Sequence, residues 1–467
     1  GSYNKINGIY GCAHEELIKK TLMEKWGFRG FVVSDWNATH YIENVQNCIK
    51  AGLSLEMPRA KKYKRSNLEE AYSKGLFNEK DLDEVIKSLL RVMFLVGLFD
   101  DKESLPIGSR NTSEHKKIAR KIAEEGIVLL KNERELLPLD INKIKTITIK
   151  GPNADRNFAE GGGSSAVKPP YEITPLEGLK QKITRKIKII DDVSQADVVI
   201  LILGLNHEEN NDTESWDRNT LELPQNQLDL IDQVAEQNKN TIIILINGSP
   251  IKMDSWIGKV NGIIEVWYPG QEGGHVIADI IFGDINPSGK LPLTFPKKLE
   301  DSPAHTSEKR YPGNKKVFYD EGIFVGYRYF DKYGIEPLFP FGFGLSYTSF
   351  KYKNLKVNKS QLKLNEELEI SFELENIGDR FGAEIIQLYI QEITPQVERP
   401  LKELKRFKKV SLNSGKNIKI DFRINKHDLA YFDEKLNSWN TNDGKYNILI
   451  GSSSRNIKLK ESFEYKK

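Results

Sequence analysis

The hydrophobic pattern of the 467 residues changes its period along the chain, and this excludes a single uniform fold. Up to about residue 300, short apolar runs alternate with stretches of helical period, which is the β–α rhythm of parallel sheets. After residue 347, apolar and polar residues alternate in short segments such as "EISFELEN", which is typical of an antiparallel sandwich. The sequence therefore predicts a multidomain protein, α/β followed by all-β.

The β–α part divides at the polar stretch "DDKESLPIGSRNTSEH". A closed (β/α)8 barrel takes about 250 residues, so residues 1–105 have room only for the C-terminal part of a TIM-type barrel. The next region contains the apolar runs "KTITIKG", "ADVVILILGLN", "NTIIILING" and "NGIIEVWYPG", with helical patterns "NQLDLIDQVAEQN" and "EGGHVIADIIFG". We expect four segments: the partial barrel at 1–105, an α/β sandwich domain at 106–300, a connecting loop region at 301–347 and a β-sandwich at 348–467.

Composition narrows the classes of function. Lys and Arg total 69 against 66 Asp and Glu, and the charges are interspersed, so we expect neither nucleic acid nor a membrane surface as a partner. The longest apolar runs fall far short of the roughly 20 residues of a membrane helix. Cys12, Cys48 and the seven histidines match no metal or redox spacing, so no metal and no cofactor is predicted. The Lys-rich, cysteine-poor composition favours the cytoplasm only slightly, and homo-oligomerisation stays open.

The stretch "GFRGFVVSDWNATH" places a carboxylate at the end of an apolar run. Phe31, Val32 and Val33 fit a strand buried on both faces, and Asp35 follows at its C-terminal end, where parallel β–α folds carry their chemistry. Such an Asp is a nucleophile, a base, a metal ligand or a plain turn cap. Trp36 favours a sugar-stacking surface beside it.

A second group of acids follows the run "ADVVILI" in a loop before a helix. Acids in loops are usually solvated, and composition does not single out one member of the group, Glu208, Glu209, Asp212, Glu214 and Asp217. The nearby "GGGSS", residues 161–165, lacks the phosphate-loop arrangement and is interpreted as a flexible loop.

Motifs spread over nearly the whole chain resemble glycoside hydrolase family 3, the β-glucosidase-like enzymes. The matching segments stand in the order of that family and include "WGFRGFVVSDW", "GLNHEENNDTESWDRNTLELP", "YPGQEGGHVIADIIFGDINPSGKLPLTFP" and "PLFPFGFGLSYTSF". The resemblance implies that the final sandwich is fibronectin type III-like. It also implies an active site in a cleft between the barrel and the α/β sandwich.

The resemblance assigns roles to five residues of this sequence. Asp35 is the expected nucleophile and Glu214 the expected general acid/base, two carboxyls that retaining hydrolysis needs about 5–5.5 Å apart. Tyr3 matches a tyrosine beside the nucleophile, and Trp36 matches a tryptophan that lines the sugar site. Trp216 is placed at the border of the leaving-group subsite.

Other positions are read as structural or depart from the family pattern. Asp217 and Arg218 look like an ion pair that fixes the loop. Ser215 stands where the family usually has Gly, and only Gly reaches positive φ freely. Ser54 stands where an Asp is common, so we expect one carboxylate of the barrel to be missing.

The resemblance also implies barrel residues that would precede "SYNKING", and these bind the sugar hydroxyls in the family. We therefore expect either a fragment or a barrel completed by a separate chain, and at best weak activity from these 467 residues alone. The expected substrates are small β-glucosides or oligosaccharides. The alternatives are a β-xylosidase of the same family and a non-catalytic carbohydrate-binding fragment.

Overall fold

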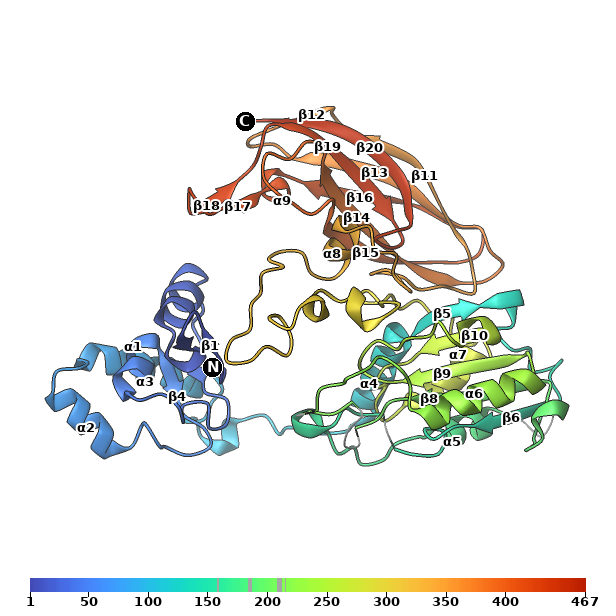
Figure 1. Cartoon of the computed structure of the whole chain (residues 1–467), viewed down its shortest axis with the longest axis horizontal. Helices are drawn as coiled ribbons and strands as arrows, with labels where there is room; N and C mark the ends of the chain where they lie inside the picture. Colours follow the sequence, from blue (N-terminus) through green and yellow to red (C-terminus); the bar gives the residue numbers. More distant parts are fainter. Residues whose placement is uncertain (158, 184–186, 208–211, 215) are drawn as a thin grey trace. The chain divides into compact units, whose positions relative to one another are not determined.

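The computed structural model describes residues 1–157, 159–183, 187–207, 212–214 and 216–467, and the chain forms two compact units. The first unit is Gly1–Ser109 and the second is Arg110–Lys467. Figure 1 shows the first unit in blue and the second in cyan to red. Each unit is described by itself below.

The first unit is built around two short parallel strands. β3 (Val32–Val33) pairs with β4 (Leu53–Leu55), and Phe31 and both valines are only half-buried. The prediction of a strand buried on both faces is therefore wrong for this structure, because within residues 1–109 β4 is the one strand that pairs with β3. These residues form no closed barrel, so the partial barrel stays a prediction. The other elements are β1 (Lys5–Ile6), β2 (Ile9–Tyr10), a helical segment at Glu16–Lys25, α1 (Val45–Ala51), α2 (Arg65–Ser73) and α3 (Glu79–Leu95).

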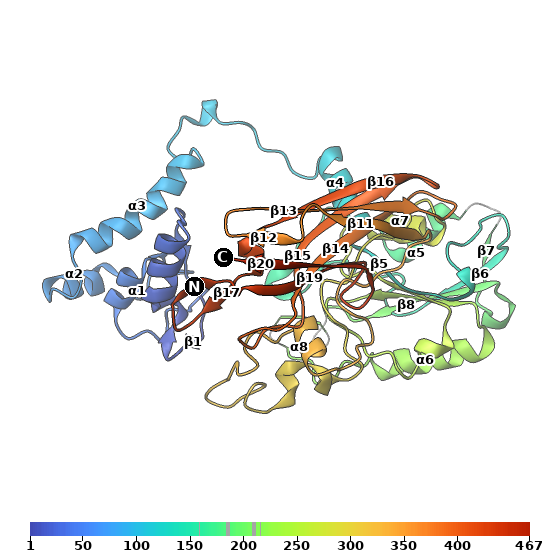
Figure 2. The ribbon, with the colours of Figure 1, turned by 90° about the horizontal axis from the view of Figure 1, so that it is seen from above.

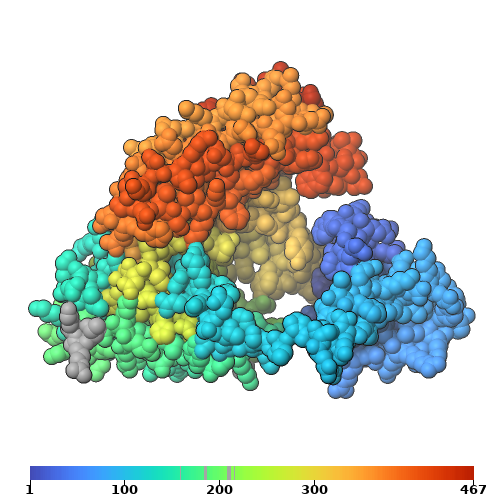
Figure 3. All heavy atoms as spheres, turned by 180° about the vertical axis from the view of Figure 1, so that it is seen from behind, coloured from blue at the N-terminus to red at the C-terminus, as the bar shows by residue number. Residues whose placement is uncertain are grey.

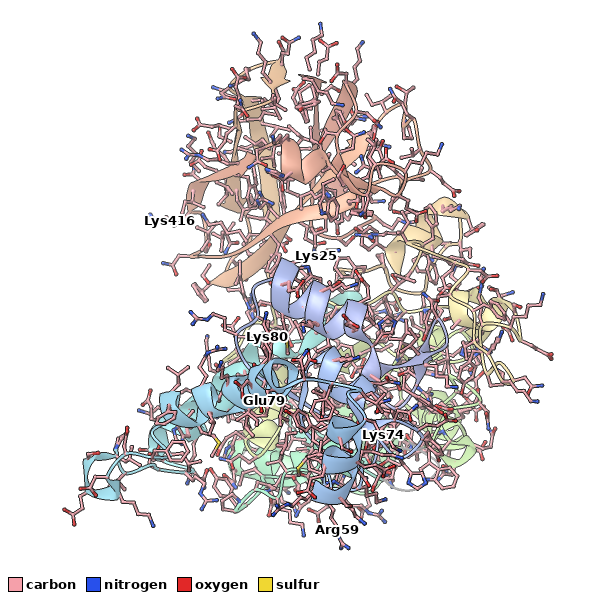
Figure 4. All side chains as sticks on the ribbon, turned by 90° about the vertical axis from the view of Figure 1, so that its left-hand side faces the viewer. Lys25, Arg59, Lys74, Glu79, Lys80 and Lys416 are labelled. Atoms are coloured by element: carbon pink, nitrogen blue, oxygen red, sulfur yellow. The ribbon has the colours of Figure 1, made fainter. Side chains whose placement is uncertain are left out.

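Aliphatic and aromatic side chains, together with two cysteines, form the core of this unit. Cys12 and Cys48 are buried free thiols packed with Leu53, as expected for core-filling cysteines. Charged residues lie at the ends of the helices: Figure 4 labels Lys25, at the end of the Glu16–Lys25 segment, and Lys74, which follows α2. Each of the loops that follow β3 and β4 combines buried residues with an exposed stretch, residues 35–37 after β3 and 58–60 after β4.

The second unit begins with an α/β domain whose sheet has the strand order β5-β10-β9-β8-β6-β7. β5 runs antiparallel at one edge and the other five strands are parallel. The predicted strands and helices of this region are confirmed, and β5 is an addition to them. The strands are β5 (Val128–Asn132), β6 (Thr146–Lys150), β7 (Lys188–Ile189), β8 (Val198–Gly204), β9 (Thr241–Ile246) and β10 (Gly262–Glu265).

Helices cover both faces of this sheet, which explains its continuous apolar strands. Successive residues of β8 enter opposite cores, with Ile200 in one and Leu201 in the other, and both are fully buried. Figure 2 shows the sheet between α6 on one side and α5 and α7 on the other. The helices of the domain are α4 (Ser113–Gly126), α5 (Pro175–Lys182), α6 (Gln225–Gln237) and α7 (Gly273–Ile281).

The second unit ends in a two-sheet β-sandwich, as the alternating pattern predicts. One sheet has the order β11-β13-β16 and the other β12-β20-β19-β14-β15. Along β13, alternate residues from Leu368 to Asn376 are buried, so one face of the strand supplies the core. α8 (Tyr327–Lys332) precedes the sandwich, and β17 (Tyr431–Asp433) and β18 (Ser438–Asn440) form a separate two-stranded sheet. The other elements are β11 (Phe350–Val357), β12 (Gln361–Lys363), β13 (Leu368–Asn376), β14 (Gly382–Glu392), β15 (Glu403–Leu412), β16 (Asn417–Ile424), α9 (Lys426–Leu429), β19 (Gly444–Gly451) and β20 (Ile457–Lys466).

The sandwich packs on the α/β domain, as Figure 3 shows in orange and red over cyan to yellow. A nearly buried ion pair joins them, because Lys290 Nζ lies 3.0 Å from Glu384 Oε1. Asn286 also donates to the Phe381 carbonyl oxygen. No described helix is long and apolar enough to cross a membrane, and the described residues contain no cluster of metal-binding side chains.

Candidate active site

In the first unit, the structure brings together three of the residues predicted to form the site. Asp35 directly follows Ser34, whose amide pairs with the Leu55 carbonyl oxygen at the ends of β3 and β4. Asp35 Oδ1 accepts from the Trp36 amide at 2.6 Å and from the Tyr3 hydroxyl at 3.2 Å. The Tyr3 hydroxyl also lies 2.5 Å from the Trp36 carbonyl oxygen, and because it has one proton it donates to one of the two acceptors at a time.

Both aromatic side chains beside Asp35 expose a large surface. Trp36 is 54% exposed and Tyr3 is 46% exposed, while Asp35 itself is exposed. Within the described chain, Asp35 Oδ2 accepts no hydrogen bond, so one oxygen of the carboxylate is held and the other is available. This arrangement suits a nucleophile with aromatic surface next to it.

A second carboxylate, Glu56, follows β4 and was not identified from the sequence. It is buried and accepts from the Thr39 hydroxyl at 2.5 Å and from the backbone amides of residues 61–63. Burial by itself raises the pKa of Glu56, but these hydrogen bonds outweigh it and hold the pKa below its ordinary value. Glu56 thereby fixes the loop after β4, and the Met57 carbonyl oxygen accepts from the Asn37 amide in the Asp35 loop. A Glu placed directly after the second parallel strand is the signal that would have found it.

In the second unit, Glu214 lies in the segment between β8 and α6. Its Oε2 accepts from the Ser164 amide at 2.5 Å, and Ser164 belongs to the glycine-rich loop after β6. Both residues line a hollow of about 440 Å³ together with Gly248 and Tyr268, which follow β9 and β10. The hollow therefore lies at the carboxyl ends of four parallel strands, where open α/β sheets bind ligands.

The glycines of residues 161–163 allow this close approach. A Cβ on Gly162 would stand 2.5 Å from Thr213 Oγ1, and a Cβ on Gly163 would stand 2.4 Å from the Glu214 Cβ. Gly163 also has a φ of +67°, in the left-handed region that favours glycine. The "GGGSS" stretch was interpreted only as a flexible loop, but it forms a short helical turn and a backbone donor for Glu214.

The remaining members of the acidic group have different places. Asp212 accepts from the Gly248 amide at 2.5 Å and from the Tyr268 hydroxyl at 2.9 Å. Asp217 hydrogen-bonds to Tyr311, and this bond together with burial raises the pKa of the tyrosine. Trp216 is 46% exposed. Glu208, Glu209 and Ser215 lie outside the described residues.

The predicted ion pair between Asp217 and Arg218 is wrong. The guanidinium of Arg218 instead donates to the Ser249 hydroxyl at 2.8 Å and to the Pro250 carbonyl oxygen at 3.0 Å. Burial lowers the pKa of Arg218, and the charge of nearby Asp212 opposes that shift. Arg218 thus fixes the loop as expected, but through the segment after β9, because neutral acceptors there reach its buried guanidinium.

Comparison with known proteins then identifies the family. The model of the glycosyl hydrolase family 3 N terminal domain matches residues 2–92, and that of the family 3 C-terminal domain matches residues 127–327. A fibronectin type III-like domain model matches residues 384–454. Among curated relatives, a β-xylosidase of Formosa agariphila is 31% identical, over 98% of this chain and 68% of its own length. The chain belongs to glycosyl hydrolase family 3.

Other relatives in family 3 are β-glucosidases by name. The thermostable β-glucosidase B of Acetivibrio thermocellus is 38% identical over 99% of this chain, and the chain spans 62% of that protein's length. The crystal structure of the Bifidobacterium adolescentis family 3 β-glucosidase has a TM-score of 0.89 and 32% identity, covering 99% of this chain and 69% of that one. The multidomain family 3 fold with its fibronectin type III-like sandwich is therefore confirmed. The separation of the Asp35 and Glu214 carboxyls, which lie in different units, stays a prediction.

Proposed function

We propose that this family 3 chain acts as a retaining exo-β-glycosidase on terminal non-reducing β-D-glucosyl residues of small glucosides and oligosaccharides. The observation that carries the proposal is the state of Asp35, with one oxygen held by Tyr3 and the Trp36 amide and the other available. Glu214, in a hollow at the strand ends of the second unit, supports an acid/base role.

The proposed reaction has two displacements. Asp35 attacks the anomeric carbon while protonated Glu214 gives its proton to the glycosidic oxygen, so the bond to the aglycone breaks and a glycosyl ester forms. Glu214, now a carboxylate, takes a proton from water, and the resulting hydroxide attacks the anomeric carbon and breaks the ester. The sugar leaves with its configuration retained. Tyr3 keeps the Asp35 carboxylate oriented, and the exposed Trp36 and Trp216 offer stacking surfaces for sugar and leaving group.

A mechanism-based trap tests the nucleophile. In 2,4-dinitrophenyl 2-deoxy-2-fluoro-β-D-glucoside the fluorine slows both displacements, while the good leaving group keeps the first one fast enough for the glycosyl ester to accumulate. Mass spectrometry of a digest should therefore find the fluoroglucosyl group on Asp35. Asp35→Asn should show no label, while Asp83→Asn, an exposed helical control on α3, should be labelled like the wild type. A folded wild-type protein that takes no label would favour a carbohydrate-binding fragment instead.

The main alternative substrate is a β-xyloside, since one relative bears the name β-xylosidase. Values of kcat/KM for nitrophenyl β-glucoside and β-xyloside decide between them, and the higher one identifies the sugar. We further propose that barrel residues outside these 467 bind the sugar hydroxyls, which the shorter length relative to the Acetivibrio enzyme supports. The same kcat/KM values are therefore measured for these 467 residues alone and for the native protein, with any further chain or segment it contains, purified from its own cells. Equal kcat/KM values for the two preparations would refute the proposal that further barrel residues bind the sugar.

A further inference from the structure

The carboxylate of Asp212 binds three donors from two other loops. Oδ2 accepts from the Gly248 amide at 2.5 Å and from the Tyr268 hydroxyl at 2.9 Å, while Oδ1 accepts from the Ser249 hydroxyl at 3.2 Å. Gly248 and Ser249 follow β9, and Tyr268 follows β10. The amide of Asp212 itself donates to the Asn206 carbonyl oxygen, near the end of β8. One side chain thus joins the loops at the ends of three neighbouring strands.

A buried carboxyl lies beneath the same loops. Glu265, the last residue of β10, is fully buried and accepts from the Asn247 amide group at 3.0 Å and from the Trp267 amide at 3.1 Å. Asn247 also donates to the Ser249 carbonyl oxygen. Burial, with the nearby Asp212 charge, raises the pKa of Glu265 to about 8. Hydrogen bonds therefore join the ends of β9 and β10 to each other, and Asp212 connects the loop after β8 to both of them.

Asp212 stands only two residues before Glu214. A single Thr213 separates them, so a displacement of Asp212 moves the backbone that carries Glu214. Glu214 has a hydrogen bond from Ser164 on its other side. Four loops thus meet at this point, and the Glu214 segment is bound on one side by the glycine-rich loop and on the other by the Gly248–Ser249 and Tyr268 donors.

We propose that Asp212 is a positioning residue for Glu214, holding the acid/base segment at the strand ends through Gly248, Ser249 and Tyr268. This inference rests on the proposed function, because it names the group that Asp212 positions. Asp212 itself touches no reacting atom in this role. Its loss should impair the steps in which Glu214 transfers a proton and leave the attack by Asp35 much less affected.

The dependence of kcat/KM on the leaving group distinguishes a loss of Glu214 positioning from a general loss of active protein. Dinitrophenolate leaves without help from an acid, whereas the second sugar of cellobiose needs a proton. Asp212→Asn keeps the size of the side chain but puts an amide group in place of one acceptor oxygen. We expect kcat/KM for cellobiose to fall on the order of 10–100-fold and that for 2,4-dinitrophenyl β-glucoside to change by less than about 3-fold.

Three comparisons make the result decisive. Tyr268→Phe removes one of the three donors and should show the same selectivity to a smaller extent, even if Asp212→Asn folds poorly. Asp229→Asn, which replaces an exposed carboxylate on α6, should leave kcat/KM unchanged for both substrates. Added azide should raise turnover of the dinitrophenyl glucoside by Asp212→Asn and give the β-glucosyl azide, because azide needs no general base.

The rate of amide hydrogen exchange shows how firmly the loops are held, and its measurement needs no substrate. In Asp212→Asn, peptides that contain Gly248 should exchange faster than in the wild type, and peptides of β8 should not. Equal losses of kcat/KM on both substrates, or unchanged kinetics, would overturn the proposal. A wild type inactive on every glycoside would instead refute the proposed function, and the exchange result would still report whether Asp212 holds the loops.

Discussion

Gly163→Ala tests whether the glycine-rich loop sets the position of Glu214. The added Cβ would lie 2.4 Å from the Glu214 Cβ and 2.6 Å from its Oε2. Carbon atoms in contact prefer a separation of about 3.5–4.0 Å, so the two segments must separate by about 1 Å or more. Since Ser164 donates to Glu214 from the next position in the same loop, this separation acts directly on the candidate acid/base.

Two costs follow, and they are separable. The φ of +67° is strained for alanine, which costs about 1–2 kcal/mol of folding free energy. The displacement of Glu214 acts on activity, because a misplacement of about 1 Å costs on the order of 100-fold in rate. We therefore expect a modest loss of stability and a large loss of kcat/KM on cellobiose.

Gly415→Ala is the matched control. Its φ is +68°, almost that of Gly163, and no atom lies within 4 Å of the added Cβ. Denaturant unfolding should show the loss from backbone strain in both variants and a further loss in Gly163→Ala from the contact with Glu214, while kcat/KM on cellobiose should fall only in Gly163→Ala. A Gly163→Ala protein with wild-type kcat/KM would refute the reasoning that this loop sets the position of Glu214.

Three further changes test the fold and its ionisable groups. Ile243→Ala, in the fully buried centre of β9, should cost about 2–5 kcal/mol in urea unfolding, and a loss below 1 kcal/mol would contradict the two-sided core. Because the folded pKa of Glu265 is raised to about 8, its stabilisation is complete below the ordinary carboxyl pKa and is lost as pH rises toward 8. Glu265→Gln should remove up to about 1.4 kcal/mol per pH unit of that dependence, and thermal unfolding at several pH values measures it. The pKa of Glu56 is lowered, so its stabilisation is present above the ordinary pKa and lost as pH falls; Glu56→Gln should weaken this acid sensitivity, and an unchanged acid transition would contradict it.

Periodicity predicted the elements that bury continuous apolar surface. β8 and β9 are fully buried runs between helices, and α6 and α7 carry a clear helical period, so each is visible from its own residues. β5 was not predicted, because its place depends on antiparallel pairing with β10, more than a hundred residues away. In the first unit the strand "FVVS" was recognised, but its burial depends on neighbours that a single strand does not specify.

The candidate site was predictable only in its side-chain chemistry. The grouping of Tyr3, Asp35 and Trp36 agrees with the expectation from the family motifs. The predicted partner of Arg218 was wrong, and Glu56 was not predicted at all. Among the acids near Glu214, Asp212 is distinguished only by its contacts with residues that follow β9 and β10. Those contacts arise from the order of strands in the sheet and not from any local pattern.

Four carboxylates of the two units, those of Asp35, Glu56, Asp212 and Glu214, each accept at least one hydrogen bond from a backbone amide. The Trp36 amide binds Asp35, the Ser164 amide binds Glu214, the Gly248 amide binds Asp212, and three consecutive amides bind Glu56. Side-chain truncation removes none of these donors, so alanine substitution at Ser164 should leave the position of Glu214 nearly unchanged. Changes that move the backbone, as at Gly163, or that remove the acceptor, as at Asp212, act on every bond of the loop together. The positions of these carboxylates therefore depend on the backbone of the loops as well as on side-chain donors such as the Tyr268 hydroxyl.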